Sequence, residues 1–90
     1  MIFNYMEILV DDTLKLLLDS TPDYQDICKC ECCMDDIKAK ALNNLPPFYV
    51  TGKKGEVYGE YKRSNSETYT HILIEVTKAI EFISKHTSHQ

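Results

Sequence analysis

The stretch Cys28-Lys29-Cys30-Glu31-Cys32-Cys33 contains all four cysteines of this 90-residue chain. Thiols this close together are too local to form a disulfide framework. Zinc in proteins is held by three or four sulfur or nitrogen ligands at the corners of a tetrahedron. Cys30 and Cys33 have the C-x-x-C spacing with which a turn offers two sulfurs to one metal, and Cys28 lies two residues earlier. The stretch therefore predicts a zinc site on a turn that leads into a helix.

The fourth ligand of this predicted site stays open. Cys32 is an awkward partner for Cys33, because neighbouring residues project in different directions. We nevertheless keep it with Cys28, Cys30 and Cys33 as the four predicted metal ligands. Water could also complete the site, and the remaining candidates are three histidines and one nearby carboxylate, namely His71, His86, His89 and Asp36.

Other cysteine chemistries compete with zinc. A C-x-x-C redox pair usually follows a strand of an α/β sheet, and the sequence before Cys30 predicts no such strand. An iron–sulfur cluster would need four thiolates, and this spacing does not match the usual runs. No Cys–His–Asx catalytic set can be proposed from residue order, and no H-x-E or H-E-x-x-H pattern occurs. We therefore expect no enzyme, and keep as an alternative a thiol redox sensor that pairs Cys30 with Cys33 or Cys32.

Hydrophobic periodicity outside the cysteines predicts three helices. Residues 34–44 follow the cysteines directly, so the first amides of this helix are expected to point toward Cys33 and favour thiolates. Residues 4–19 form the first helix, and Thr21-Pro22 predicts a short helical turn after it. Residues 66–85 have the cleanest apolar stripe. The apolar positions of the three faces are Met6, Leu9, Val10, Leu14 and Leu17; Met34, Ile37, Ala41 and Leu42; and Tyr69, Ile72, Leu73, Val76, Ile80 and Ile83.

A short β-hairpin is predicted between the second and third helices. Asn43-Asn44-Leu45-Pro46-Pro47 ends the preceding helix, because proline cannot continue it. Residues 48–51 and 56–61 have strand character and flank the turn Gly52-Lys53-Lys54-Gly55. A lone hairpin is marginally stable in water, so it must pack on helices or pair across a dimer. The predicted fold class is a mainly α, small helical domain with this hairpin, and we expect it to be dimeric.

The size and charge of the chain narrow its function. Ninety residues make one domain, residues 1–90, with a thin core that a metal or a partner can reinforce. A net charge of −4 opposes binding to a nucleic acid polymer. No apolar run reaches membrane-spanning length, and the N-terminus lacks a signal-peptide pattern, so we expect a cytoplasmic protein. The only basic cluster suits a small anionic ligand at most, and consists of Lys53, Lys54, Lys62 and Arg63.

Four stretches of the chain resemble the late competence development protein ComFB family. They are Asn4-Tyr5-Met6-Glu7-Ile8-Leu9-Val10, the C-x-C-x-x-C of Cys28, Cys30 and Cys33, the segment from Asp36 through Ala41-Leu42-Asn43-Asn44-Leu45-Pro46-Pro47-Phe48-Tyr49-Val50, and Thr77-Lys78-Ala79-Ile80-Glu81. The cysteine block followed by A-L-N-x-L-P-P-x-Y-V is the specific part. The likeness extends over nearly the whole chain.

The resemblance implies a small, mainly helical, homodimeric zinc protein. Together with the missing catalytic motifs, it leads us to expect a regulatory or interaction role without catalysis. It places the metal on Cys28, Cys30 and Cys33. Some members complete the site with a late cysteine, and this chain has none after Cys33, so Cys32 or His86 would substitute. Cyanobacterial relatives are associated with cyclic dinucleotides, which implies an alternative function as a cyclic di-AMP or cyclic di-GMP receptor. The basic cluster, and tyrosines able to stack on bases, would serve that function: Tyr49, Tyr58 and Tyr61.

Overall fold

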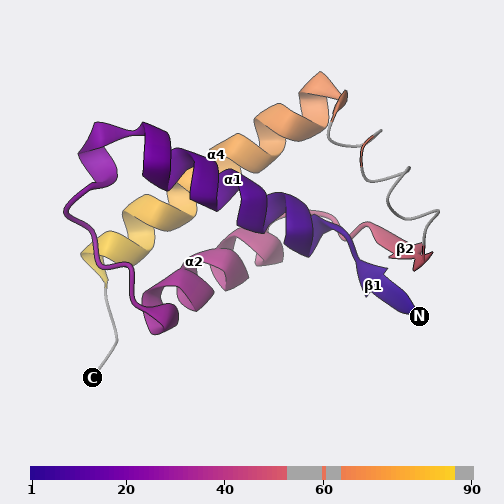
Figure 1. The fold of residues 1–90 in the computed structure, drawn as a ribbon, viewed down its shortest axis with the longest axis horizontal. Coiled ribbons are helices and arrows are strands. Elements are labelled where there is room, and N and C mark those ends of the chain that lie inside the picture. Colours follow the sequence, from indigo (N-terminus) through magenta and orange to yellow (C-terminus); the bar gives the residue numbers. More distant parts are fainter. Residues whose placement is uncertain (53–59, 61–63, 87–90) are drawn as a thin grey trace.

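The computed structural model describes residues 1–52, 60 and 64–86 as three helices and a two-stranded sheet. Helices α1, α2 and α4 pack side by side, and the sheet lies at one end of them (Figure 1). The prediction of a small, mainly helical domain is confirmed. The elements are β1 (Ile2–Asn4), α1 (Met6–Ser20), the 3₁₀ turn η1 (Pro22–Tyr24), α2 (Glu31–Asn43), β2 (Tyr49–Thr51) and α4 (Ser66–Lys85).

The helix boundaries follow from local capping. Helix α4 has the predicted bounds, and the Asn65 side chain accepts a hydrogen bond from the Thr68 amide at 3.0 Å, which satisfies one free N–H of the first turn. The predicted turn at Thr21-Pro22 is confirmed as η1. Helix α1 begins at Met6, two residues later than predicted, because the chain before it is extended in β1.

The strand pairing differs from the predicted hairpin. A strand does occur at Tyr49–Thr51, but its antiparallel partner is β1, with Phe3 opposite Val50. Strand β1 was not predicted, because three residues are too few for an alternating pattern to show. The predicted second hairpin strand, residues 56–61, lies outside the described residues except for Glu60. The prediction is wrong at Glu60, which is helical and accepts a hydrogen bond at 2.9 Å from the Ser64 hydroxyl four residues later.

The Asn4 side chain joins the two ends of the sheet to α1. Its Oδ1 accepts hydrogen bonds from the Phe48 amide at 2.7 Å and from the Met6 amide at 3.1 Å. The Tyr5 amide in turn donates to the Phe48 carbonyl at 2.7 Å. This contact brings together two stretches 44 residues apart, both of which carry the family resemblance. It explains why the chain before α1 pairs with β2.

We expect Asn4→Ala to lower the free energy of unfolding by about 2 kcal/mol, because two part-buried amides lose their acceptor. Urea denaturation monitored by circular dichroism measures this change. Asn4→Asp keeps an acceptor oxygen at the same place and is expected to restore most of the loss. Equal stability of the alanine variant and the parent would show that water replaces the side chain at no cost.

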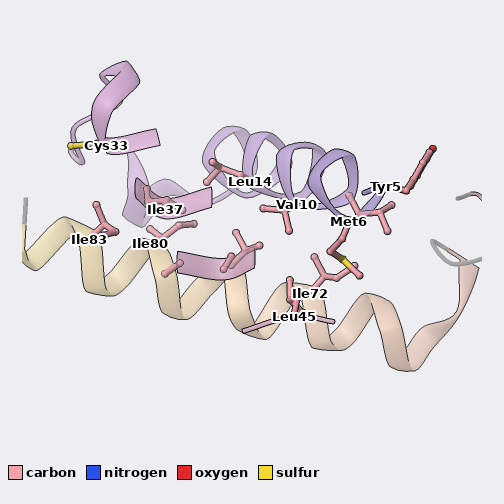
Figure 2. Close-up of a cluster of buried hydrophobic side chains, with 14 of the residues drawn as sticks. Tyr5, Met6, Val10, Leu14, Cys33, Ile37, Leu45, Ile72, Ile80 and Ile83 are labelled. Carbon is pink, nitrogen blue, oxygen red and sulfur yellow. The ribbon is translucent and has the colours of Figure 1, made fainter. Parts of the chain in front are cut away.

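The core is one continuous layer between the three helices. Val10, Ala41, Val76 and Ile80 are fully buried in it, and Figure 2 shows the row of side chains that runs from Tyr5 and Met6 at one end to Cys33 and Ile83 at the other. The predicted apolar stripes account for most of it. Tyr69 and Leu73 are the exceptions, because Tyr69 is 39% exposed and Leu73 does not belong to the core cluster. Within the described residues no helix is both long and apolar enough to cross a membrane.

Asp11 links α1 to α2 on the surface. Its carboxylate lies 2.9 Å from Lys15 Nζ on the same helix and 3.4 Å from Lys38 Nζ on α2. The hydrogen bond from Lys15 is the largest influence and lowers the pKa of the Asp11 carboxyl; burial opposes it, and the hydrogen bond from Lys38 lowers the pKa further. The two lysines thus favour the charged form in the folded protein.

The lowered pKa of Asp11 predicts a small dependence of stability on pH. Its contribution is present above the ordinary carboxyl pKa of 3.8 and is lost as the pH falls through the lower folded value. We therefore expect Asp11→Asn to cost up to about 1 kcal/mol at pH 7, since the pair is one-third exposed and screened, and less in strong acid. Thermal melts of both proteins across this range measure the difference. A cost that does not shrink in acid would show that charge plays no part.

Candidate metal centre

The cysteines lie at the end of the helices opposite the sheet. Cys28 and Cys30 belong to the loop after η1, and Cys33 lies in the first turn of α2. Helix α2 begins at Glu31, three residues earlier than predicted. The reason is that Cys30 acts as the helix cap, with its Sγ accepting a hydrogen bond from the Cys33 amide at 3.4 Å. The first amides of α2 therefore point to Cys30, not to Cys33 as the sequence analysis expected.

Three of the four predicted ligands form one cluster. The Sγ atoms of Cys28, Cys30 and Cys33 all lie within 4.8 Å of one another. Tetrahedral zinc with sulfur at about 2.3 Å places its ligands roughly 3.8 Å apart, so small side-chain rotations bring these sulfurs to ligand distance. All four cysteines are free thiols in the structure. The donor set thus fits a soft, thiolate-binding metal such as zinc.

The surroundings of the cluster affect its thiols differently. The hydrogen bond from the Cys33 amide is the main cause that lowers the pKa of the Cys30 thiol, and a hydrogen bond with Cys28 lowers it further. Burial is the main cause that raises the pKa of the Cys33 thiol to about 12, and a hydrogen bond with Cys30 is the next. Cys33 is only 1% exposed and belongs to the hydrophobic core. One wall of the site is therefore closed to water, as in structural metal sites.

Cys32 lies apart from this cluster. Its side chain is exposed, and its Sγ is 4.0 Å from Asp36 Oδ2, one helical turn further along α2. Desolvation, and then the charge of Asp36, raise the pKa of this thiol. Residues 32 and 33 project from different sides of the helix, as their adjacency suggests. The role of Cys32 as a metal ligand stays a prediction.

The described histidines lie outside the cluster as well. His71 is in the first half of α4, with Nε2 3.8 Å from Glu75 Oε2. His86 is the C-cap of α4, at the end of the helices where the cysteines lie. It is exposed, and the centre of its ring is 4.5 Å from the centre of the Phe82 ring. Among the described residues, the three cysteines are the only group of three or more metal-ligating side chains. His89 lies outside the described residues, and the fourth ligand stays open.

Tyr24 connects the cysteine loop to α4, a contact that the sequence analysis did not foresee. Burial, followed by the charge of Glu81, raises the pKa of its hydroxyl, which also hydrogen-bonds Thr77. Ile27 and Cys28 pack against the same core. The segment Thr77–Glu81 therefore supports the loop that carries the thiols. Its presence among the four resembling stretches was the only signal that could have indicated this contact.

The residues suggested for a nucleotide fall mostly outside the described part of the chain. These are Lys53, Lys54, Lys62, Arg63, Tyr58 and Tyr61. Tyr49 is described, and its side chain is exposed on β2. A groove of about 360 Å³ lies elsewhere, between α2 and α4, where Lys40 Nζ is 4.2 Å from the centre of the Phe82 ring and Lys78 lines the same groove.

Comparisons with known proteins agree with the fold and with the motifs. The model of a family described as late competence development protein ComFB matches residues 3–87. A Bacillus subtilis (strain 168) protein, competence protein ComFB, is 26% identical over 88 residues, which cover 98% of this chain and 87% of that protein. A solved structure reported as the structural characterization of the late competence protein ComFB from Bacillus subtilis superposes with a TM-score of 0.79 at 26% identity, covering 98% of this chain and 96% of that one.

Proposed function

This chain belongs to the late competence development protein ComFB family, and we propose that it is a zinc-binding regulatory or interaction module without catalytic activity. The observation that carries the proposal is the cluster of Cys28, Cys30 and Cys33, whose sulfurs all lie within 4.8 Å of one another. Three thiolates from one loop and one helix start supply three of the four donors of a structural zinc site.

The proposed role of the metal is mechanical. The cluster joins the loop after η1 to the first turn of α2, and Tyr24 and Ile27 attach that loop to the core. A metal held there would tie the loop to α2, so its binding free energy becomes folding free energy. The burial of Cys33 supports a closed structural site in preference to one that is open to substrate.

We further propose that the module acts as a homodimer. Exposed large apolar side chains support self-association: Ile8 on α1, and Ile74 and Phe82 on α4. Native mass spectrometry of protein purified without an affinity metal or chelator tests both parts at once. The expected species is a dimer with one zinc per chain. A metal-free monomer with a Cys30–Cys33 or Cys30–Cys32 disulfide would favour the thiol redox sensor instead.

A second candidate function is that of a cyclic-dinucleotide receptor. The groove between α2 and α4 supports an anionic, aromatic ligand, because it places two lysines beside the Phe82 ring: Lys40, and Lys78, which is 3.9 Å from the Glu75 carboxylate in the same groove. Calorimetric titration with cyclic di-AMP and cyclic di-GMP tests this function, with Lys40→Ala as the groove variant and Lys85→Ala as a control of equal charge. Absence of heat at high micromolar ligand would exclude it.

A further inference from the structure

A second pocket lies between α1 and α4, away from the cysteines and from the α2–α4 groove. Its volume is about 90 Å³, several times the roughly 10–15 Å³ that one water molecule needs. Its floor is apolar, since Leu9 and Ile72 are both 2% exposed. Its remaining lining residues are Asp12, Thr13, Leu16 and Tyr69.

Thr13 is the unusual member of this pocket. It is 7% exposed and is the only buried polar residue in the described part of the chain. Its hydroxyl forms no hydrogen bond with any described residue, although a helical threonine can bond the carbonyl four residues back. A buried hydroxyl without a partner costs about 1–3 kcal/mol. The pocket thus holds a hydrogen-bonding group that a ligand entering it could satisfy.

The rim of the pocket is acidic and aromatic. Asp12 and the half-exposed Leu16 come from α1, and Tyr69 comes from α4. Helix α1 carries four carboxylates and one lysine, and that lysine, Lys15, is 2.9 Å from Asp11 and also interacts electrostatically with Asp12, so the helix keeps an excess of negative charge. The rim therefore attracts a cation, and the apolar floor attracts a hydrocarbon chain. A second copy of this acidic helix, placed at the pocket by two-fold symmetry, would bring carboxylates together, and the repulsion between them disfavours a second copy as the occupant.

We propose that this pocket receives an arginine side chain presented by a basic segment of a partner protein. The apolar stem of arginine lies along Leu9, Leu16 and Ile72, as long cationic side chains do on apolar surfaces. Its guanidinium donates to the Asp12 carboxylate and to the Thr13 hydroxyl, and its flat face stacks on Tyr69. The proposal is independent of zinc, because no cysteine lines the pocket.

The probe that tests this is the peptide acetyl-Ala-Ala-Arg-Ala-Ala-amide, followed in two-dimensional amide NMR spectra of the full chain. We expect saturable shifts of the amides of Thr13, Leu16 and Tyr69, with a Kd on the order of 1 mM. The same peptide with citrulline, which is isosteric and neutral, is expected to bind about tenfold more weakly, a loss of roughly 1.4 kcal/mol.

Three variants identify the contacts. Asp12→Asn and Thr13→Val are each expected to weaken the arginine peptide about fivefold or more, and Asp19→Asn, which removes the same charge elsewhere on α1, is expected to leave Kd unchanged. Thr13→Val is also expected to keep or raise Tm, because it removes an unpaired buried hydroxyl. The proposal would be overturned if both peptides bound equally well, or if Asp19→Asn weakened binding as much as Asp12→Asn. It would also be overturned if the peptide shifted no amide signals, or if these amide signals shifted with protein concentration alone.

Discussion

Cys28→Ser is expected to abolish zinc retention and to lower Tm by more than about 10 °C, since each kcal/mol moves Tm by roughly 4–8 °C at this size. The serine hydroxyl does not supply the thiolate that zinc requires. The loop after η1 then loses its attachment to the first turn of α2. Elemental mass spectrometry and calorimetric melts of the same sample measure the two effects together. Cys28 suits the test because its side chain is only half-buried, so the core stays intact.

Cys32→Ser is the matched control for that variant. It makes the same chemical change four residues away, on a thiol that is exposed and directed to Asp36. We expect it to keep its zinc and most of its stability. Loss of zinc in both variants would identify Cys32 as the fourth ligand. If the unmutated protein melts at the same temperature after a chelator has removed its zinc, the metal has no structural role.

Ile80→Ala is expected to have the largest effect on the core. Ile80 is fully buried on α4, within the layer that α4 forms with α2. Removing three carbons leaves a cavity and costs about 2–5 kcal/mol, which in a domain of this size lowers Tm by about 10 °C or more. Urea denaturation at fixed zinc concentration measures the change in the free energy of unfolding.

Two variants calibrate the core result. Ile80→Val removes one carbon from the same site and is expected to cost about 0.5–1.5 kcal/mol. Ile74→Ala makes the same truncation on the same helix where the side chain is 46% exposed, so its cost within one chain should be small, and any loss through the proposed dimer surface should depend on protein concentration. Because alanine forms helices better than isoleucine, helix propensity cannot cause a loss at either site, and equal losses for Ile80→Ala and Ile74→Ala would show that burial in the core does not determine the effect.

The helices were predictable from the sequence because their signals are local. The apolar stripe from Ile72 to Ile83 and the cap at Asn65 define α4 without reference to the rest of the chain. The pairing of β1 with β2 was not predictable, since it depends on the Asn4–Phe48 hydrogen bond between distant residues. The start of α2 was misplaced because a sulfur cap, Cys30, is not among the usual capping residues.

The candidate metal centre was predictable in composition but not in electrostatics. Spacing pointed first to Cys28, Cys30 and Cys33, the three thiols that the fold brings together, and Cys32 was kept as a fourth predicted ligand that the fold leaves outside the cluster. The burial that raises the pKa of Cys33 depends on its place at the end of the core, next to residues of α4 more than 40 positions away. The same long-range packing places Tyr24 against Thr77, which no local pattern shows.

X-ray absorption at the zinc edge of the purified protein tests the central proposal most directly, because it reports the atoms bound to the metal. We expect at least three sulfur ligands at about 2.3 Å. A first shell composed of nitrogen and oxygen alone, or protein that carries no zinc, would contradict the assignment of this cysteine cluster as a zinc site.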